Sequence, residues 1–471
     1  FGERVNILVI SPEAGLSTSA LATAVNRITD AFDRGGIMAL TCSPYYKAIF
    51  SDSSDMQCIF KGTERLHYKP FEIWKSQNSN HTYIYNEEFF GRPYVYGEPS
   101  QPYADNHIRY SFLASAALEF AAVSGFKPNA VLGHEWGGAL AGHLIHSLYA
   151  SEFDKIPFFL TVHNIKYDFL VPDTEIGKLG LPRADHNMDG YEYWGKVSLL
   201  KAGILYANMV LLPSSGYRDA ILNTNIAGGM TGFLQRNAAK IKGIQFGVSY
   251  SLWDFNKDTG LPIQVAKQNA KLELEQLVGT KFNDKLLLYA HLDKEAGDTT
   301  ETLSTLLADL AGLDVFVLVG MEKDQPEWDY YNNVAAEYPN NFCVRPLGKD
   351  SNTLKKYLAG SDILFAGNLR EPSSSILLKA LAAGTIPITG KDTGVASMLK
   401  SYTDNRLENA NAFLVEDPKS PVMMLRSIKK CQEVYKLSSW KCVVENAYSF
   451  RYEWDRTIAQ YLLTLGEFSG L

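Results

Sequence analysis

The strongest constraint on the fold is an alternation of short apolar runs with longer amphipathic stretches along most of the chain. The apolar runs are rich in Val, Ile, Leu and Phe and have the length of buried strands: Val5–Ile10, Ala130–Gly133, Phe158–His163, Met209–Pro213, Lys285–His291, Asp314–Gly320, Asn341–Pro346, Asp362–Ala366 and Ile386–Thr389. The stretches between them have helical length: Ser19–Arg34, His107–Ser124, Ala139–Ser151, Val197–Tyr206, Thr300–Ala311, Ser351–Ala359, Ser375–Ala383 and Val422–Val434. Because apolar strands joined by helices are typical of covered parallel sheets, the alternation predicts an α/β fold.

The alternation occurs twice, which predicts two doubly wound domains. The strand series pauses between residues 220 and 284, where Gly228-Gly229 and Trp253-Asp254-Phe255-Asn256 are typical of loops. We place the boundary near Gly247, which gives a domain of residues 1–246, a domain of residues 247–448 and a terminal segment of residues 449–471. Ligands of such sheets bind at the carboxyl ends of the strands, so we expect the domains to face each other across a cleft.

The charge of the chain limits the partners that it can attract. Its 471 residues include 45 Lys and Arg against 52 Asp and Glu, a net charge of −7, so no whole-molecule field favours nucleic acid or an anionic membrane. Local basic residues must therefore meet any polyanionic ligand. No window approaches the roughly 18 consecutive apolar residues of a membrane span, and we expect no transmembrane segment.

Several common cofactor motifs are absent from the sequence. No GxGxxG follows a strand and no GxxxxGK[ST] occurs, which excludes the usual nicotinamide and P-loop sites. His134-Glu135 begins like a zinc-binding HExxH helix, but Gly138 occupies the second histidine position. We therefore expect neither a metal site nor a bound cofactor. The five cysteines are widely spaced and form no CxxC pair, which favours a reducing compartment.

Polar residues follow three of the predicted strands, at the end of the sheet where ligands bind. The turn Leu16–Leu21 could hold an anion at a helix start or form a plain Ser/Thr N-cap. His163 and Asn164 are either active-site groups or a structural pair. Glu371 either faces the cleft or complements the dipole of the helix that follows. The residues alone leave these alternatives open.

A set of short segments, in order along nearly the whole chain, points to one family. They are Phe89-Phe90-Gly91-Arg92-Pro93-Tyr94-Val95-Tyr96-Gly97, Asp105-Asn106-His107-Ile108-Arg109-Tyr110, His134-Glu135-Trp136, Thr161-Val162-His163-Asn164, Leu200-Lys201-Ala202-Gly203-Ile204, Gly243-Ile244, Glu371-Pro372, Gly384-Thr385-Ile386-Pro387-Ile388 and Tyr452-Glu453-Trp454-Asp455. In these segments the chain resembles the bacterial glycogen synthase and plant starch synthase family.

The resemblance implies a GT-B fold, in which two Rossmann-like domains clasp a nucleotide sugar, usually ADP-glucose. Such enzymes add glucose to the 4-hydroxyl of an α-glucan end with retention and without a metal. The resemblance also implies that segment 449–471 is a helix crossing back to the first domain. It assigns His163 and Glu371 to the reacting sugar, and places Glu135, Trp136, Asn164 and Tyr94 among the substrate contacts.

The positions that would face the donor diphosphate depart from the family pattern. The glycine-rich KTGGL loop aligns with Ser17-Thr18-Ser19-Ala20-Leu21, so Ser17 replaces the lysine and the following acidic residue is Thr23. In the RLxxQKG segment, His291 replaces the arginine and Ala296 the lysine. Ser198 replaces an asparagine, and the EPCGLTQ loop reads Glu371-Pro372-Ser373-Ser374-Ser375-Ile376-Leu377.

These replacements remove cations from a reaction that develops negative charge. Losing one preorganised donor costs roughly 2.7–4 kcal/mol of transition-state stabilisation. A protonated His291, Lys294 or Lys391 could substitute.

Our leading hypothesis is a catalytically degenerate homologue that binds an α-glucan or serves a protein assembly. The alternative is an active α-1,4-glucan synthase using ADP-glucose or UDP-glucose, and a third is a transferase with a different donor. The plant branch would imply the plastid stroma, and the bacterial branch the cytoplasm.

Overall fold

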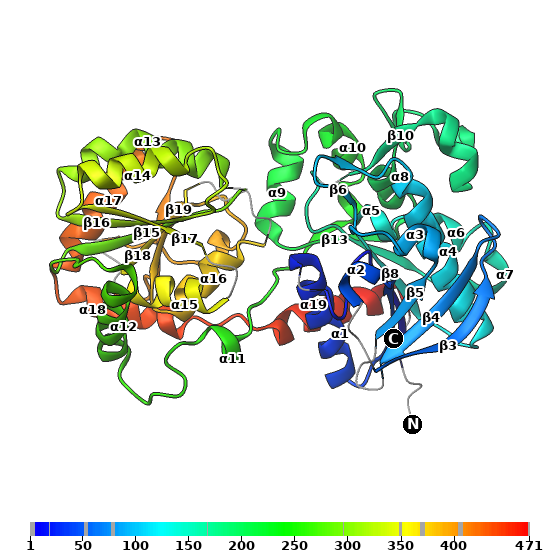
Figure 1. Ribbon diagram of the computed structural model, residues 1–471, viewed down its shortest axis with the longest axis horizontal. Coiled ribbons are helices and arrows are strands. Elements are labelled where there is room, and N and C mark those ends of the chain that lie inside the picture. The colour runs from blue at the N-terminus through cyan, green and yellow to red at the C-terminus, as the bar shows by residue number, and fades with distance from the viewer. Residues whose placement is uncertain are drawn as a thin grey trace. The chain divides into compact units, whose positions relative to one another are not determined.

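The computed structural model describes residues 5–17, 19–50, 55–76, 81–166, 168–294, 296–347, 351–367, 373–403 and 408–469. The chain divides into two compact units (Figure 1). The first comprises Phe1–Pro213, Arg218–Ile244 and Trp454–Leu471, and the second Ser214–Tyr217 and Gln245–Glu453. Each unit contains a largely parallel sheet covered by helices, so the predicted α/β class is confirmed.

The first unit is built on a nine-stranded sheet, as far as its described residues show. The strand order is β14-β13-β9-β8-β1-β2-β5-β4-β3. The bounds are β1 (Asn6–Ile10), β2 (Met38–Pro44), β3 (Met56–Thr63), β4 (Pro70–Ser76), β5 (His81–Tyr85), β8 (Ala130–His134), β9 (Phe158–Thr161), β13 (Met209–Leu212) and β14 (Ile241–Gly243). Among the described strands of this sheet, the antiparallel pairs are β3–β4 and β4–β5, at one edge. The parallel strands β1, β8 and β9 are almost wholly buried, as their continuous apolar runs require.

Helices cover both faces of this sheet (Figure 1). They are α1 (Ala20–Arg34), α2 (Lys47–Phe50), α3 (Glu87–Phe90), α4 (Asn106–Val123), α5 (Glu135–Gly138), α6 (Ala141–Leu144), α7 (Ala150–Phe153), α8 (Leu199–Tyr206), most of α9 (Ser215–Asn223), α10 (Thr231–Arg236) and α19 (Trp454–Ser469). Smaller elements are the pair β6 (Gly97–Glu98) and β7 (Gln101–Pro102) and a three-stranded sheet of β10 (Leu170–Pro172), β12 (Lys196–Ser198) and β11 (Glu192–Tyr193).

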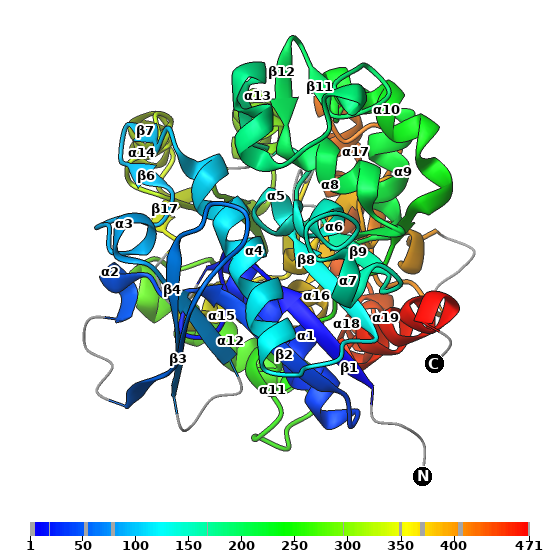
Figure 2. The same cartoon turned by 90° about the vertical axis from the view of Figure 1, so that its right-hand side faces the viewer.

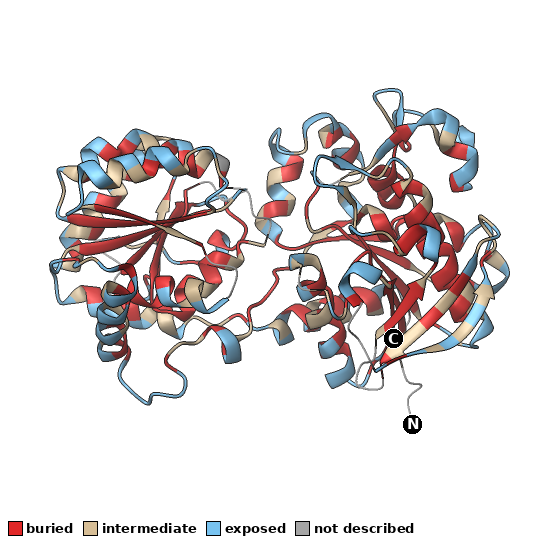
Figure 3. Cartoon of the chain, in the orientation of Figure 1, coloured by how far each residue is buried: buried red, intermediate tan, exposed pale blue. Residues whose placement is uncertain are grey.

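The second unit is built on a six-stranded parallel sheet of the order β17-β16-β15-β18-β19-β20, within the described residues. Its strands are β15 (Leu286–Leu292), β16 (Val315–Met321), β17 (Phe342–Pro346), β18 (Ile363–Phe365), β19 (Ile386–Gly390) and β20 (Phe413–Val415). Its helices are α11 (Tyr250–Trp253), α12 (Ile263–Val278), α13 (Gly297–Ala311), α14 (Trp328–Glu337), α15 (Ser351–Gly360), α16 (Ser375–Ala382), α17 (Pro421–Tyr435) and α18 (Ser439–Ser449). The strands form the buried centre of the unit (Figure 3).

Some predicted elements differ from those observed. The expected helix Ala139–Ser151 is wrong: it is broken into α6 and α7, because Tyr149 leaves the helical path and its hydroxyl bonds to Ser115 of α4. The predicted pause between residues 220 and 284 contains β14, α10 and α12. No helix of the described residues is long and apolar enough to cross a bilayer.

The last helix, α19, belongs to the first unit although it ends the chain. The side chains of Tyr461 and Leu465 are completely buried. The Tyr461 hydroxyl lies 3.3 Å from the hydroxyl of Thr161 in β9, and Phe468 packs edge-on against Phe159. The helix therefore covers strand β9, whose end carries His163.

We expect this contact to contribute substantially to stability. Replacing Tyr461 by Ala removes a buried ring and leaves a cavity, which should lower the free energy of unfolding by about 3–5 kcal/mol. Leu463 of the same helix is 71% exposed, so Leu463→Ala should change the free energy of unfolding by no more than about 0.5 kcal/mol. Urea unfolding of wild type and the two variants measures both changes in the free energy of unfolding. Equal stability of the two variants would contradict the contribution of α19 to the stability of the first unit.

Candidate functional site

The candidate site of the first unit begins where strands β8 and β9 end side by side. His134, the last residue of β8, is paired in register with Thr161, the last residue of β9. Glu135 follows β8 directly, and His163 and Asn164 follow β9. Glu135, which the resemblance places among the substrate contacts, thus lies beside the predicted strand-end pair His163 and Asn164 at one edge of the sheet, as the parallel topology requires.

Glu135 ties these two strand ends together. Its carboxyl oxygen Oε1 accepts hydrogen bonds from the backbone N–H groups of His163, at 2.6 Å, and Asn164, at 3.3 Å. The other oxygen, Oε2, is buried and has no hydrogen-bond partner among the described residues. Its backbone takes a φ of 54°, in the left-handed region that side chains seldom adopt. Burial raises the pKa of the carboxyl to about 8, so at neutral pH it is mostly protonated and can donate a hydrogen bond.

Two histidines beside Glu135 are also uncharged. His134 Nδ1 and His163 Nε2 share a hydrogen bond of 3.1 Å. Desolvation lowers the pKa of His163 to about 3 and that of His134 well below its usual value, and the neighbouring His163 lowers the pKa of His134 further. His134 Nε2 is buried without a partner among the described residues. The edge therefore offers hydrogen-bonding groups but no net charge.

Aromatic rings line the approach to Glu135. Trp136 stacks on Phe169 with centroids 5.2 Å apart and meets Tyr110 edge-on at 4.8 Å. Trp136 remains only partly buried, so part of its indole can contact a ligand. Tyr94, the other predicted aromatic contact, is 43% exposed.

The loop after β1 holds a carboxylate where the family would place a cation. Glu13 Oε2 accepts a hydrogen bond of 2.8 Å from the Ser17 hydroxyl, and Glu13 Oε1 accepts one of 2.7 Å from Tyr96. The hydroxyl of Ser17, which the resemblance aligns with the family's lysine, is therefore already hydrogen bonded to an acidic side chain. Thr18 lies outside the described residues. Thr23 is exposed in α1, and its hydroxyl donates back to the Ser19 carbonyl.

Ser198 serves the start of helix α8. Its hydroxyl oxygen accepts a hydrogen bond from the backbone N–H of Lys201 and donates one of 2.5 Å to Asp168. Burial raises the pKa of Asp168 to about 6 although that carboxyl also accepts backbone hydrogen bonds from Phe169 and Leu200. Ser198 is thus a helix cap with both its hydrogen-bonding roles filled.

In the second unit, two donor-site positions flank the loop between β15 and α13. His291 Nδ1 shares a hydrogen bond of 2.9 Å with the Tyr289 hydroxyl, and His291 Nε2 lies 3.7 Å from Asp293. Ala296 is buried at the start of α13. At the positions that the resemblance aligns with an arginine and a lysine, the chain therefore has the half-buried imidazole of His291 and the methyl group of Ala296.

The two lysines that could substitute are both paired with acids. Lys294 Nζ lies 2.6 Å from Asp324, and the two side chains are 62% and 68% exposed. Lys391 forms an ion pair with Glu416. These neighbours hold the pKa of each lysine above its usual value, so both carry a positive charge.

Glu371 lies outside the described residues, but the end of its loop is described. Ser374, at the glycine position of the EPCGLTQ pattern, has a φ of 52°. A non-glycine residue pays about 1–2 kcal/mol for this left-handed conformation. The Ser374 hydroxyl is buried and has no partner among the described residues. The backbone shape that glycine favours is thus kept without the glycine.

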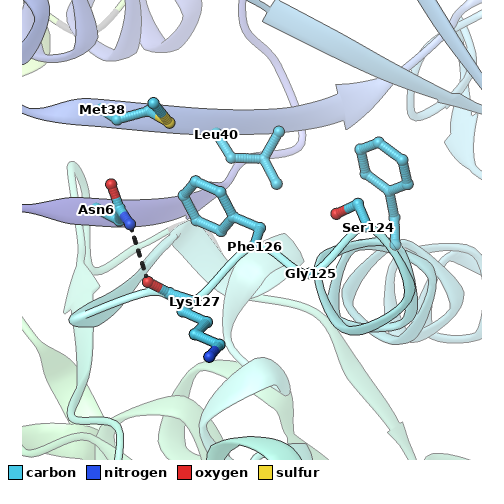
Figure 4. A pocket seen from close by; sticks show the side chains of 8 residues that line it. Asn6, Met38, Leu40, Ser124, Gly125, Phe126 and Lys127 are labelled. Carbon is cyan, nitrogen blue, oxygen red and sulfur yellow. Dashed lines mark hydrogen bonds between the residues drawn. The ribbon is translucent and has the colours of Figure 1, made fainter.

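A pocket of about 430 Å³ lies elsewhere in the first unit (Figure 4). Asn6 and Met38, at the starts of β1 and β2, line it with Phe126 and Lys127. It therefore opens at the amino ends of the strands, opposite the predicted site residues. Within the described ranges no three His, Cys, Asp or Glu side chains are grouped so that they could hold a metal ion.

Sequence reasoning missed Glu13, His134 and Asp168 as members of the site. Glu13 follows β1 by three residues, and its place at a strand end was the signal that could have identified it. His134 was considered only as a metal ligand. Asp168 acts through Ser198, thirty residues later in the chain, and no local pattern marks that pairing.

Comparisons with known proteins agree with this architecture. A family model described as the starch synthase catalytic domain matches residues 6–236, and one described as glycosyl transferases group 1 matches residues 299–438. The chain is similar to the glycogen synthase of Syntrophotalea carbinolica, with 27% identity over 402 residues, 81% of this chain and 80% of that protein. It is 26% identical over 468 residues to the glycogen synthase of Francisella tularensis subsp. novicida, which covers 93% of this chain and 94% of that protein.

Solved structures show the same fold. The catalytic domain of starch synthase IV from Arabidopsis thaliana, bound to ADP and acarbose, matches with a TM-score of 0.84 and 20% identity over 100% of both chains. Sucrose-phosphate synthase from Thermosynechococcus elongatus matches with a TM-score of 0.58 and 13% identity over 100% of both chains. The predicted GT-B fold is confirmed.

Glu135 should make stability depend on pH in a defined direction. Its folded pKa of about 8 exceeds the roughly 4.3 of an unfolded glutamate, so the unfolded state binds fewer protons and stability falls as pH rises toward 8. His134 and His163 are neutral in the folded state, and because both proteins carry them, their protonation in the unfolded state cancels from the comparison. Between about pH 6.5 and 8, wild type should therefore lose about 2 kcal/mol relative to Glu135→Gln.

Urea unfolding of both proteins at the two pH values measures this difference. The glutamine keeps an oxygen for the His163 and Asn164 N–H groups, so the folded geometry is preserved. Every other titrating group is common to the two proteins. Equal pH slopes would show that Glu135 is ionised in the folded chain.

Proposed function

Because the chain belongs to the glycogen and starch synthase family, we propose that its first unit binds an α-glucan and that transfer of glucose from a nucleotide sugar is lost. The domain of residues 1–246 is the acceptor side and that of residues 247–448 the nucleotide-sugar side, with residues 449–471 returning to the first. The bound glucan allows the protein to serve as a binding or scaffold subunit.

The observation that carries this proposal is the hydrogen bond from Ser17 to Glu13. A diphosphate needs cations or free N–H groups where its charge develops. Here the loop after β1 presents a carboxylate, whose two oxygens already accept hydrogen bonds from Ser17 and Tyr96. A phosphate brought to this loop would meet negative charge and no lysine, so the loop favours exclusion of the donor.

The uncharged strand ends support binding of a neutral sugar. Glu135 is mostly protonated at neutral pH, and His134 and His163 are neutral. Groups of this kind can donate to and accept from hydroxyls without the desolvation of a charge. Trp136 adds an aromatic surface with an amphipathic character suited to a sugar ring.

One observation favours the alternative, an active synthase that uses ADP-glucose or UDP-glucose. The ion pairs of Lys294 and Lys391 are exposed, and exposed pairs contribute only about 0–1 kcal/mol. Either lysine could therefore leave its acid for a diphosphate at little cost.

Purified protein should show no measurable glucose transfer from ADP-glucose or UDP-glucose to glycogen or maltooligosaccharides. With three cationic donors absent, each worth about a hundredfold to a thousandfold in rate, turnover should fall by several orders of magnitude even with strong non-additivity. A radiolabelled transfer assay measures it, with Glu371→Ala as the matched control. Robust turnover that Glu371→Ala abolishes would overturn the proposal.

Nucleotide binding distinguishes the proposed inactive protein from the alternative, an active synthase, without a measurement of turnover. A ligand that binds only the folded state raises the melting temperature by mass action, so an active donor site predicts a clear shift with millimolar ADP or UDP. We expect none. Thermal scans with and without nucleotide therefore give the second readout of the same prediction.

The first unit should still bind a short α-glucan through Trp136. Replacement of Trp136 by Ala removes the partly exposed ring and should weaken maltoheptaose binding at least about tenfold, as for an aromatic hot spot. Trp136→Phe keeps a ring and should retain most of the affinity. Isothermal titration calorimetry measures both, with circular dichroism to confirm folding. Unchanged affinity in Trp136→Ala would place the glucan elsewhere.

A further inference from the structure

The tip of the β11–β12 hairpin presents an exposed tryptophan. Trp194 is 81% exposed, and it lies with Gly195 between the two strands, at φ values of 52° and 77°. Two-residue turns of this kind favour Asn-Gly or Asp-Gly, and a bulky side chain in the left-handed region is an outlier that calls for a reason. Burial does not supply that reason, because the ring faces solvent.

The hairpin that carries Trp194 is anchored firmly at its base. Tyr191 and Val197, which flank the tip, are completely buried in the core beneath α8. The Tyr191 hydroxyl donates a 2.7 Å hydrogen bond to the Pro182 carbonyl. At the tip itself, the Gly195 N–H donates to the Glu192 carboxylate at 2.6 Å. The ring is therefore presented on a rigid element, which limits the entropy lost when a ligand binds.

Two aromatic rings and one glycine shape the exposed surface. Tyr193 and Trp194 meet nearly perpendicular, at 73°, with centroids 6.2 Å apart. Gly229 lies against both: a Cβ there would stand 2.9 Å from the Tyr193 hydroxyl and 3.0 Å from Trp194 Nε1. The edges of both rings are thus held beside Gly229. Figure 2 shows β11 and β12 projecting beside α10, the helix that follows Gly229.

The surroundings of the rings are polar. Asp189, in the segment that leads to β11, forms an exposed ion pair with Arg236 at the end of α10. In the same segment, the Glu192 N–H donates to the Asn187 carbonyl. Lys196 next to the tip is exposed. A protein-docking surface is usually a contiguous apolar patch of several hundred Å². A small aromatic surface of Tyr193 and Trp194, with Glu192 and Lys196 beside it in the hairpin, instead suits a sugar, whose C–H face packs on a ring while its hydroxyls meet the polar groups.

We propose that the Tyr193-Trp194-Gly195 tip is an accessory docking platform for an α-glucan, separate from the strand-end site at Glu135 and His163. This rests on the proposed function in that an α-glucan is the ligand. A glucan polymer repeats the same unit many times, so one chain can occupy both sites and gain affinity through effective concentration. The platform should therefore matter for a polymer and hardly at all for a short oligosaccharide.

Affinity electrophoresis of the full chain in gels containing glycogen tests this. Trp194→Ala should raise the apparent Kd for glycogen about tenfold, while Trp194→Phe should stay close to wild type because it keeps a ring. Tyr68 provides a matched control, since it is also 81% exposed and also has a positive φ, of 55°. Tyr68→Ala should leave glycogen binding unchanged. Calorimetry with maltoheptaose should give wild-type affinity for Trp194→Ala.

The outcomes separate the platform from the proposed function. Glycogen binding within twofold of wild type in Trp194→Ala, or an equal loss in Tyr68→Ala, overturns the platform, and Trp136-dependent binding of maltoheptaose would then still support the proposed function. Loss of self-association rather than of glycogen binding in Trp194→Ala also overturns it, because the tip would be a contact between copies. Wild-type protein that binds neither sugar would contradict both.

Discussion

The first-unit site depends on one buried carboxyl group. Glu135 leaves β8 in a left-handed turn and accepts the backbone N–H groups that follow β9. These N–H groups lie beyond the last paired residues of the sheet and would otherwise need another partner. The same contact fixes His163 beside His134 and places Trp136 at the start of α5. Since a buried, unpaired carboxylate is costly, the Glu135 carboxyl is mostly protonated at neutral pH. Burial likewise keeps His134 and His163 neutral.

Polar groups around this edge are satisfied within the chain. In the first unit, Ser17 and Tyr96 donate to Glu13 and Ser198 donates to Asp168. In the second unit, taken by itself, His291 is hydrogen bonded to Tyr289. Each pair occupies a position where the family resemblance implies a group that faces the donor. A phosphate would have to break these internal hydrogen bonds before it gained its own. By contrast, Glu135 Oε2 and His134 Nε2 at the ends of β8 and β9 are buried without partners among the described residues.

The sequence predicts the central strands well because each is a continuous apolar run, as in β1, β9 and β15. It does not reveal β3 and β4, whose antiparallel pairing at the sheet edge leaves alternate residues exposed. His163 and Asn164 could be predicted because the end of a parallel strand marks ligand contacts. The environment of His163 could not, since it depends on His134 and Glu135, which are near only after β8 and β9 pair. Likewise, the sequence does not reveal that Ser17 bonds to Glu13. The Glu13 carboxylate also accepts a hydrogen bond from Tyr96, 83 residues away.

The residues that the resemblance assigns to the sugar and to the diphosphate lie on different elements. Glu135, His163 and Asn164 lie at the ends of β8 and β9, where replacing Glu135 would leave backbone N–H groups without their acceptor. Of the positions that the resemblance assigns to the diphosphate, Ser17 and Ala296 lie in loops after β1 and β15, whereas His291 lies within β15 and is paired with Gly320 of β16. Ser17 is hydrogen bonded to Glu13, and His291 to Tyr289, so both positions have partners within their own unit. The proposed loss of donor binding is therefore compatible with a stable fold, and the neutral groups at the ends of β8 and β9 suit an uncharged polymer such as the proposed α-glucan.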